Sequence, residues 1–233
     1  KELLEQFLTQ KRGNKVTFTT PKKGEKHKLV ELAWKNAMIS FEQSGERLKR
    51  EEQKTIGAMK EIQQALHLPQ TLQRVEAYDI SNTQGFESVG AMVVFENGKA
   101  KYSDYRKFKI KTVVGANDFA SMKEVIYRRM QHAITEQQQC KSGNFSKMPD
   151  LILMDGGMIQ VQAAESVLKD LNIDIPVCGM IKNNKHRTKS MLFHQREIIL
   201  HSNTEGFKLL TRIQDEVHRF AIEYHRKLRE QKT

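Results

Sequence analysis

Three runs of residues typical of β-strands follow one another between residues 74 and 110, and they constrain the fold more than any other part of the chain. The first, residues 74–81, mixes β-branched and aromatic residues. The second and third, residues 89–96 and 100–110, are separated by Asn97-Gly98, the strongest short-range signal for a β-hairpin. We therefore expect a three-stranded antiparallel meander.

Helix and strand patterns alternate after the meander. Apolar residues at helical spacing predict helices over residues 118–135, 159–171 and 207–228. Continuous apolar runs predict buried strands at residues 151–154 and 176–181, and a small hairpin is expected over residues 191–200. Parallel strands need helical crossovers, so this order of helices and strands predicts an α/β fold. We expect a mixed sheet, in which parallel strands lie beside the meander and helices flank the sheet.

The region before residue 74 has a helical pattern. We expect a short helix at residues 3–8, a strand at residues 16–20 and helix from residue 26 to 68, which Gly45 divides in two. No Pro/Gly/Ser-rich linker separates this region from the first strand. Residues 1–70 are therefore predicted to be a helical flank packed on a core domain that spans residues 71–233.

The charge of the chain favours polyanionic partners. Its 233 residues carry a formal net charge of +11, and 38% of them are hydrophobic, which is enough for a substantial core. The cations concentrate in two runs with few acids between them, and this favours nucleic acid over other partners. The runs comprise Lys99, Lys101, Arg106, Lys107, Lys109 and Lys111, and then Lys182, Lys185, Arg187, Lys189 and Arg196.

Cysteine content and apolar runs indicate the compartment. Cys140 and Cys178 have neither the spacing of a zinc site nor the number of a disulfide framework, so we expect a reducing cytoplasm. We find no signal-peptide pattern and no apolar run of membrane-spanning length, and therefore expect no membrane partner. The chain begins at Lys1, which is compatible with a piece of something longer.

Several common catalytic motifs do not occur in the sequence. It contains no GxxxxGK[ST] phosphate loop, no GxGxxG, no HExxH, no paired CxxC and no GxSxG. These absences remove the basis for P-loop, dinucleotide, zinc-protease and serine-hydrolase interpretations. What remains is a set of acidic residues near the ends of predicted strands.

Asp79 and Asp155 lie near the carboxyl ends of two predicted strands, where ligands of such sheets collect. If the first and fourth strands are neighbours, the two carboxylates meet, and they repel each other unless a divalent cation such as Mg²⁺ or Mn²⁺ bridges them. Such a site suits metal-assisted hydrolysis of phosphodiesters. Two simpler alternatives remain: Asp79 caps a turn, and Asp155-Gly156-Gly157 is a strand-to-helix turn in which Asp caps the helix.

Two further residues could join these acids. Asp118 begins a predicted helix, where an N-cap or first-turn role is the default. His218 lies on the last helix, where a single histidine is more often a packing or surface residue than a ligand. The neighbouring Asp215 and Arg219 nevertheless make this stretch unusually polar for a helix that must cover a sheet.

Six ordered stretches resemble the C-terminal half of the UvrC family, the excision nuclease of bacterial nucleotide excision repair. They are YDISNTQG at 78–85, VVFENGKAKYSDYRKFKI at 93–110, NDFASMKEVIYRR at 117–129, PDLILMDGG at 149–157, KHRT at 185–188 and RIQDEVHRFAIEYHRKLR at 212–229. The resemblance implies a ribonuclease H-like endonuclease domain over residues 71–233 and the incision on the 5′ side of a DNA lesion.

The resemblance also implies which residues act. The family's catalytic acids fall on Asp79 and Asp155, its catalytic histidine on His218 and a further functional acid on Asp118. We expect Asp79 and Asp155 to hold Mg²⁺ or Mn²⁺, with His218 either as third ligand or as the base that positions water. We expect Asp118 either near the metal, through water, or near the DNA backbone. The candidates for phosphate contacts are Arg128, Arg129, Lys185 and Arg187.

The partners implied are damaged double-stranded DNA and the pre-incision complex of DNA with UvrB. We find no match here to three parts of the family: its amino-terminal nuclease, its UvrB-binding segment and its helix-hairpin-helix repeats. We therefore expect a fragment. We also expect a monomer. The alternative function is a non-catalytic nucleic-acid-binding module on the same fold. A resolvase or transposase would share the fold and the metal site but take different substrates.

Overall fold

The computed structural model of the chain describes residues 1–81, 88–113, 115, 117–139, 143, 145–183 and 187–230, with the side chains of 225–230 excepted. The chain forms two compact units, Lys1–Arg50 and Glu51–Thr233. The division falls well before the predicted boundary at residue 70, because α3 (Ala58–Ala65) buries Ala58, Met59 and Ile62 in the core of the second unit. That the first residues pack on this core stays a prediction.

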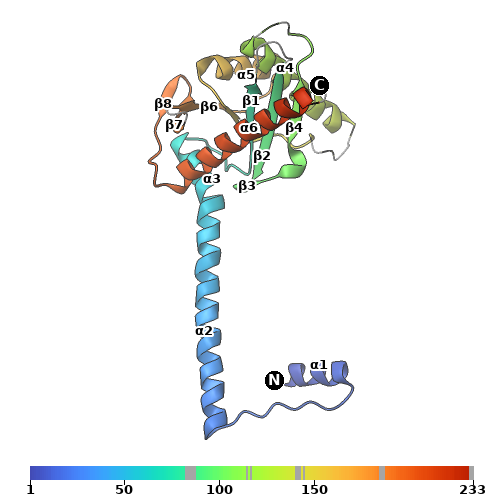
Figure 1. Cartoon of the computed structure of the whole chain (residues 1–233), viewed down its shortest axis with the longest axis vertical. Coiled ribbons are helices and arrows are strands. Elements are labelled where there is room, and N and C mark those ends of the chain that lie inside the picture. The colour runs from blue at the N-terminus through green and yellow to red at the C-terminus, as the bar shows by residue number, and fades with distance from the viewer. Residues whose placement is uncertain are drawn as a thin grey trace. The chain divides into compact units, whose positions relative to one another are not determined.

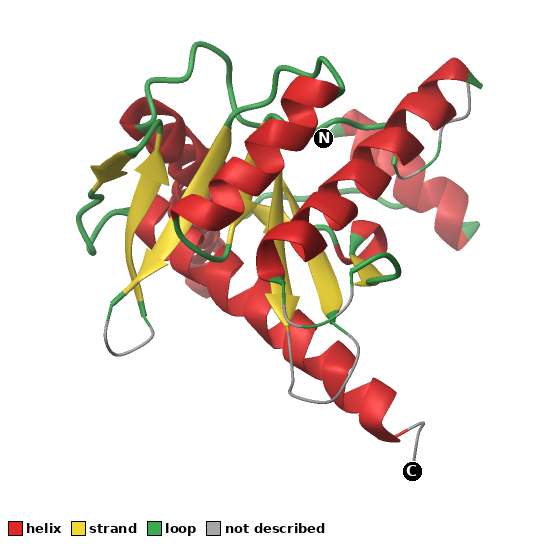
Figure 2. Ribbon diagram, turned by 90° about the horizontal axis from the view of Figure 1, so that it is seen from above, coloured by secondary structure: helices red, strands yellow, loops and turns green. Residues whose placement is uncertain are grey.

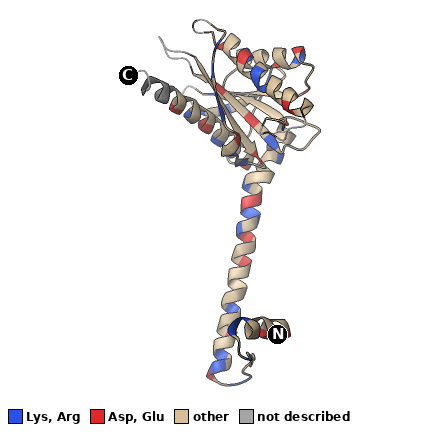
Figure 3. Ribbon diagram, turned by 90° about the vertical axis from the view of Figure 1, so that its right-hand side faces the viewer, with Lys and Arg blue, Asp and Glu red and all other residues tan. Residues whose placement is uncertain are grey.

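The first unit consists of α1 (Glu2–Arg12) and most of α2 (Glu25–Glu52), and neither helix contains a buried residue. Gly45 does not divide α2, which is continuous, and charges of both signs are interspersed along it (Figure 3). Helix α1 ends at Gly13, whose φ of 75° is the left-handed conformation that glycine tolerates best.

The strand predicted at residues 16–20 is not formed. The backbone N–H of Val16 donates to Thr9 Oγ1 at 2.9 Å, and the N–H of Phe18 donates to Glu5 Oε1 at 2.6 Å. These two amides bond to side chains of α1 rather than to a neighbouring strand.

The second unit is built on one mixed sheet (Figure 1). In space the strands run β3-β2-β1-β5-β6-β7-β8, and β4 also pairs with β2. Strands β1, β5 and β6 are parallel neighbours and the other pairings are antiparallel, which confirms the predicted α/β fold with a meander beside parallel strands. The strands are β1 (Arg74–Ser81), β2 (Val89–Glu96), β3 (Lys99–Ala100), β4 (Arg106–Lys109), β5 (Leu151–Met154), β6 (Val177–Lys182), β7 (Thr188–Phe193) and β8 (Arg196–Ile198).

The third strand of the meander is interrupted, although a single strand was predicted over residues 100–110. A short 3₁₀ helix, η2 (Tyr102–Asp104), separates β3 from β4, and both pieces pair with β2. The turn carries the carboxylate of Asp104 inward, where it accepts a hydrogen bond from Arg74 Nη1 at 2.7 Å. The interruption therefore places a counter-charge beside a buried arginine.

Helices cover both faces of the sheet (Figure 2). Helices α4 (Asp118–Gln138) and α5 (Met158–Asp170) pack against each other on one face, while α6 (Glu205–Glu230) crosses β1 and β2 on the other. Helix α3, reached from α2 through the π-helical turn η1 (Gln53–Gly57), packs on α6. Within the described residues, no helix has an apolar stretch long enough to cross a membrane.

Candidate active site

Asp79 and Asp155 are adjacent because β1 and β5 are parallel neighbours. The register pairs Tyr78 with Met154, so the residue that follows each of these comes at the same edge of the sheet. The N–H of Asp155 donates to the carbonyl of Tyr78 at 2.8 Å, which continues the β-ladder one residue beyond the end of β5. The expectation that the first and fourth strands meet is confirmed.

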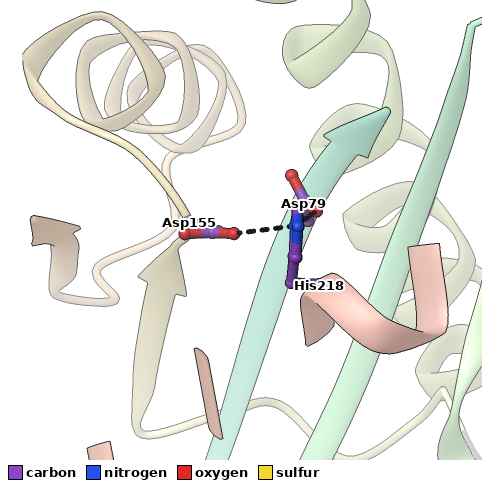
Figure 4. A group of neighbouring side chains, drawn as sticks. All are labelled: Asp79, Asp155 and His218. Carbon is purple, nitrogen blue, oxygen red and sulfur yellow. Dashed lines mark hydrogen bonds and ion pairs between the residues drawn. The ribbon is translucent and has the colours of Figure 1, made fainter. Parts of the chain in front are cut away.

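Helix α6 brings His218 to the two acids (Figure 4). Its Nδ1 lies 3.1 Å from Asp79 Oδ2 and 3.6 Å from Asp155 Oδ2. One ligand atom from each of the three residues lies within 4.8 Å of the others. Two carboxylate oxygens and an imidazole nitrogen at this spacing form a group that could hold a divalent metal ion, and the two carboxylates are ligands of the kind that Mg²⁺ and Mn²⁺ prefer.

The site shields the carboxylates more than the imidazole. The side chains of Asp155 and Asp79 are 3% and 11% exposed, whereas that of His218 is 53% exposed. Burial raises the pKa of Asp79. The hydrogen bond to His218 lowers this pKa, but the repulsion from Asp155 raises it further, and the net shift is upward. The same hydrogen bond, to Asp79, raises the pKa of His218 despite its partial burial. Both shifts favour the protonated forms of these two groups.

The simpler role for Asp155, capping the helix that follows it, is not observed. The N-cap residue of α5 is Gly157, and no side chain caps this helix. The carboxylate of Asp155 instead faces His218 and two residues that the sequence did not single out for this site, Lys182 and Gln214. The alternative in which Asp155 caps the helix is therefore wrong.

Lys182 and Gln214 hold one oxygen of Asp155 each. Lys182 Nζ donates to Oδ2 at 2.7 Å, and Gln214 Nε2 donates to Oδ1 at 2.8 Å. Gln214 also donates to the carbonyl of Met180 at 3.0 Å and accepts from Thr188 Oγ1 at 2.5 Å. Both residues had a sequence signal. Lys182 directly follows the strand predicted at residues 176–181, and Gln214 precedes the histidine by four residues, hence on the same helix face.

Gln214→Leu is expected to destabilise the fold by about 1–3 kcal/mol, the usual cost of leaving buried polar groups unpaired. Gln214 is 1% exposed, and its loss would leave Thr188 Oγ1 and the carbonyl of Met180 without these partners. Urea unfolding followed by circular dichroism measures the change. Gln162→Leu on the exposed side of α5 is the control, and equal midpoints for the two variants would contradict the prediction.

Asp118 is not part of the three-residue cluster among the described side chains. It begins α4, whose N-cap is Asn117, since Asn117 Oδ1 accepts from the N–H of Ala120 at 3.0 Å. Strand β4 is antiparallel to β2 and hence parallel to β1, so α4 starts beyond the same edge of the sheet as Asp79. A role for Asp118 in catalysis stays a prediction.

The four predicted phosphate contacts have different surroundings. Arg129 is 0% exposed, its guanidinium pairs with Glu76 at 2.8 Å, and the prediction that it contacts phosphate is wrong. Arg128 is one-third exposed and donates to the carbonyl of Lys109, while Arg187 is exposed; both stay predictions. Lys185 lies outside the described residues.

Comparison with known families shows to which family the chain belongs. The family model described as the UvrC RNAse H endonuclease domain matches residues 63–222. The chain belongs to this family. A second model, the UvrC Ribonuclease H-like domain, matches residues 1–44. Membership confirms the resemblance inferred from the six ordered sequence stretches.

Curated relatives cover this chain but extend far beyond it. "UvrABC system protein C" of Lachnospira eligens is 54% identical over 230 residues, which are 98% of this chain and 37% of that protein. The protein of the same name from Clostridium perfringens is 49% identical over 239 residues, or 100% of this chain and 38% of that protein. The chain therefore spans less than two-fifths of these family members.

Similarity to solved structures is weaker. The crystal structure of human ENDOV has a TM-score of 0.39 and 13% sequence identity, covering 67% of this chain and 85% of that one. A score this low supports no conclusion about function, and the assignment of the chain depends on the family match alone.

Proposed function

We propose that this chain is the divalent-metal-dependent endonuclease part of a nucleotide excision repair protein, and that it makes the incision on the 5′ side of a DNA lesion. The observation that carries the proposal is the convergence of Asp79, Asp155 and His218 at one edge of the sheet. The family's description as an endonuclease domain and the relatives' name as components of the UvrABC system support it.

Asp79 and Asp155 would hold the ion through one carboxylate oxygen each, with His218 as a third ligand or as the group that takes the proton of the attacking water. A bound Mg²⁺ or Mn²⁺ makes water a stronger nucleophile near neutral pH and stabilises charge on the leaving oxygen. The exposed imidazole suits contact with water, whereas the shielded carboxylates suit ligation. Gln214 orients Asp155 by holding Oδ1.

The proposed substrate is damaged double-stranded DNA, presented in the complex with UvrB. The net charge of +11 favours approach to a polyanion. Because the chain spans only 37–38% of its curated relatives, the contact with UvrB is proposed for the whole protein rather than for this region.

The test is nicking of a duplex that carries one bulky lesion and a 5′ label on the damaged strand. With the whole protein that contains this region, with Mg²⁺ or Mn²⁺, and with the damage-recognition proteins and UvrB present, we expect one cut on the 5′ side of the lesion, and we expect EDTA to abolish it. Cutting that persists in EDTA would contradict the metal mechanism. DNA binding without cutting in every condition would favour the alternative, a non-catalytic binding module.

A further inference from the structure

Lys182 places a positive charge inside the group of acids that would hold the metal. It ends β6, the strand beside β5, and its Nζ lies 2.7 Å from Asp155 Oδ2. The side chain of Lys182 is 27% exposed and that of Asp155 is 3% exposed, so much of this ion pair is shielded from solvent. Shielding strengthens the attraction relative to a surface pair.

The oxygen that Lys182 holds is the one that faces the other ligands. Asp155 Oδ1 is directed to the amide of Gln214, which is fixed in turn by Thr188. Asp155 Oδ2 lies 3.6 Å from His218 Nδ1, which is itself 3.1 Å from Asp79 Oδ2. A divalent ion placed between the three residues would therefore approach the oxygen that already accepts from Lys182.

We propose that Lys182 neutralises Asp155 in the metal-free protein, that a divalent ion displaces it from this carboxylate, and that the released ammonium then pairs with the phosphate to be cut. The proposal rests on the metal site of the proposed function. The contact supports the first step, because the ammonium offsets part of the repulsion between the two shielded carboxylates.

The charges of the site also fit a phosphodiester. Two carboxylates balance one divalent ion, so a site that contains only these groups is neutral. The ammonium of Lys182 adds the single positive charge that one backbone phosphate needs. Lysine suits such a change of partner, because its charge sits at the end of a flexible four-carbon stem with three rotatable donors.

The test is Mn²⁺ binding to the DNA-free chain, measured by electron paramagnetic resonance of the free ion. Lys182→Met is expected to bind Mn²⁺ at least about tenfold more tightly than the wild type, since no ammonium then competes for Asp155 Oδ2 or repels the ion. The same variant is expected to nick the lesion duplex more slowly at saturating Mn²⁺, because the phosphate has lost a partner. Lys182→Gln, with circular dichroism to verify folding, repeats the measurement with a polar side chain.

Lys189→Met is the matched control. Lys189 lies on β7, is half exposed, pairs with Glu197 at 2.8 Å and carries the same charge away from the three ligands. Its Mn²⁺ affinity is expected to stay within about twofold of the wild type, since a distant exposed charge is screened. Mn²⁺ affinity of Lys182→Met that is equal to or weaker than that of the wild type would overturn the role of Lys182. A wild type that binds no Mn²⁺, or an Asp155→Asn variant that binds it equally well, would instead overturn the proposed metal site.

Discussion

Asp155→Asn is expected to slow nicking of lesion-bearing DNA by about a hundredfold to a thousandfold, the range seen when one preorganised charge-stabilising group is lost from an active site. The side chain keeps its size, so the packing at the end of β5 is retained. A neutral amide is a much poorer ligand than a carboxylate for Mg²⁺ or Mn²⁺, and it no longer balances their charge. The substitution is therefore expected to lower the rate of the cutting step rather than the stability of the fold.

The measurement is single-turnover nicking at saturating enzyme, with Mn²⁺ varied, so that DNA binding and metal binding separate from the cutting step. Asp174→Asn is the control, because Asp174 is an exposed acid on the loop before β6 and makes the same change in net charge. A rate for Asp155→Asn that equals the control would place the active site elsewhere. A rate restored by high Mn²⁺ would show that Asp155 acts through metal affinity alone.

The sequence predicted that the two acids meet on the condition that the first and fourth strands are neighbours, and the structure supplies that condition. Residues 74–81 and 151–154 were recognisable as strands, and once these strands are parallel neighbours their carboxyl ends lie at one edge of the sheet. His218 was predicted from the family resemblance and not from its helical position, which by itself favours a surface role. The structure then brings its Nδ1 to 3.1 Å from Asp79.

Other features depend on contacts that no local pattern specifies. Arg128 and Arg129 are adjacent cations on α4, yet one is one-third exposed and the other is buried, because successive residues of a helix face different directions. The strand predicted at residues 16–20 failed because strand propensity alone provides no neighbouring strand, and the amide of Val16 binds Thr9 instead. The interrupted third strand likewise brings Asp104 to Arg74, a contact between residues 30 positions apart that a local pattern does not specify.

Glu76→Gln is expected to destabilise the fold by about 3–5 kcal/mol, the cost of breaking a buried ion pair by removing one partner. Glu76 is 0% exposed on β1 and accepts from two arginines, at 2.8 Å from Arg129 Nη2 and 3.2 Å from Arg74 Nη2. Its second oxygen accepts from the hydroxyl of Tyr78 at 2.6 Å, and burial holds the pKa of this phenol well above its usual range.

The effect is large because, among the residues that the structure describes, Glu76 is the acid that pairs with Arg129. The remaining hydrogen bonds of Arg129 go to the carbonyl groups of Phe145 at 2.9 Å and Lys147 at 2.7 Å, which carry no formal charge. Arg74, in contrast, keeps Glu96 at 2.9 Å and Asp104 at 2.7 Å. Guanidinium groups stay protonated throughout the accessible pH range, so Arg129 cannot relieve the loss by releasing a proton.

Urea unfolding of Glu76→Gln measures this cost against Glu165→Gln, an exposed acid on α5 whose replacement is expected to change stability by less than about 0.5 kcal/mol. Adding Arg129→Met to Glu76→Gln should restore part of the lost stability, because an uncharged side chain then replaces the unbalanced cation.

Successive residues of β1 face opposite sides of the sheet, so Glu76 lies towards α4 and Asp79 towards α6. The Glu76→Gln variant should therefore bind Mn²⁺ as the wild type does at temperatures where it stays folded. A destabilisation below about 1 kcal/mol would contradict the prediction and would mean that water solvates the charge of Arg129.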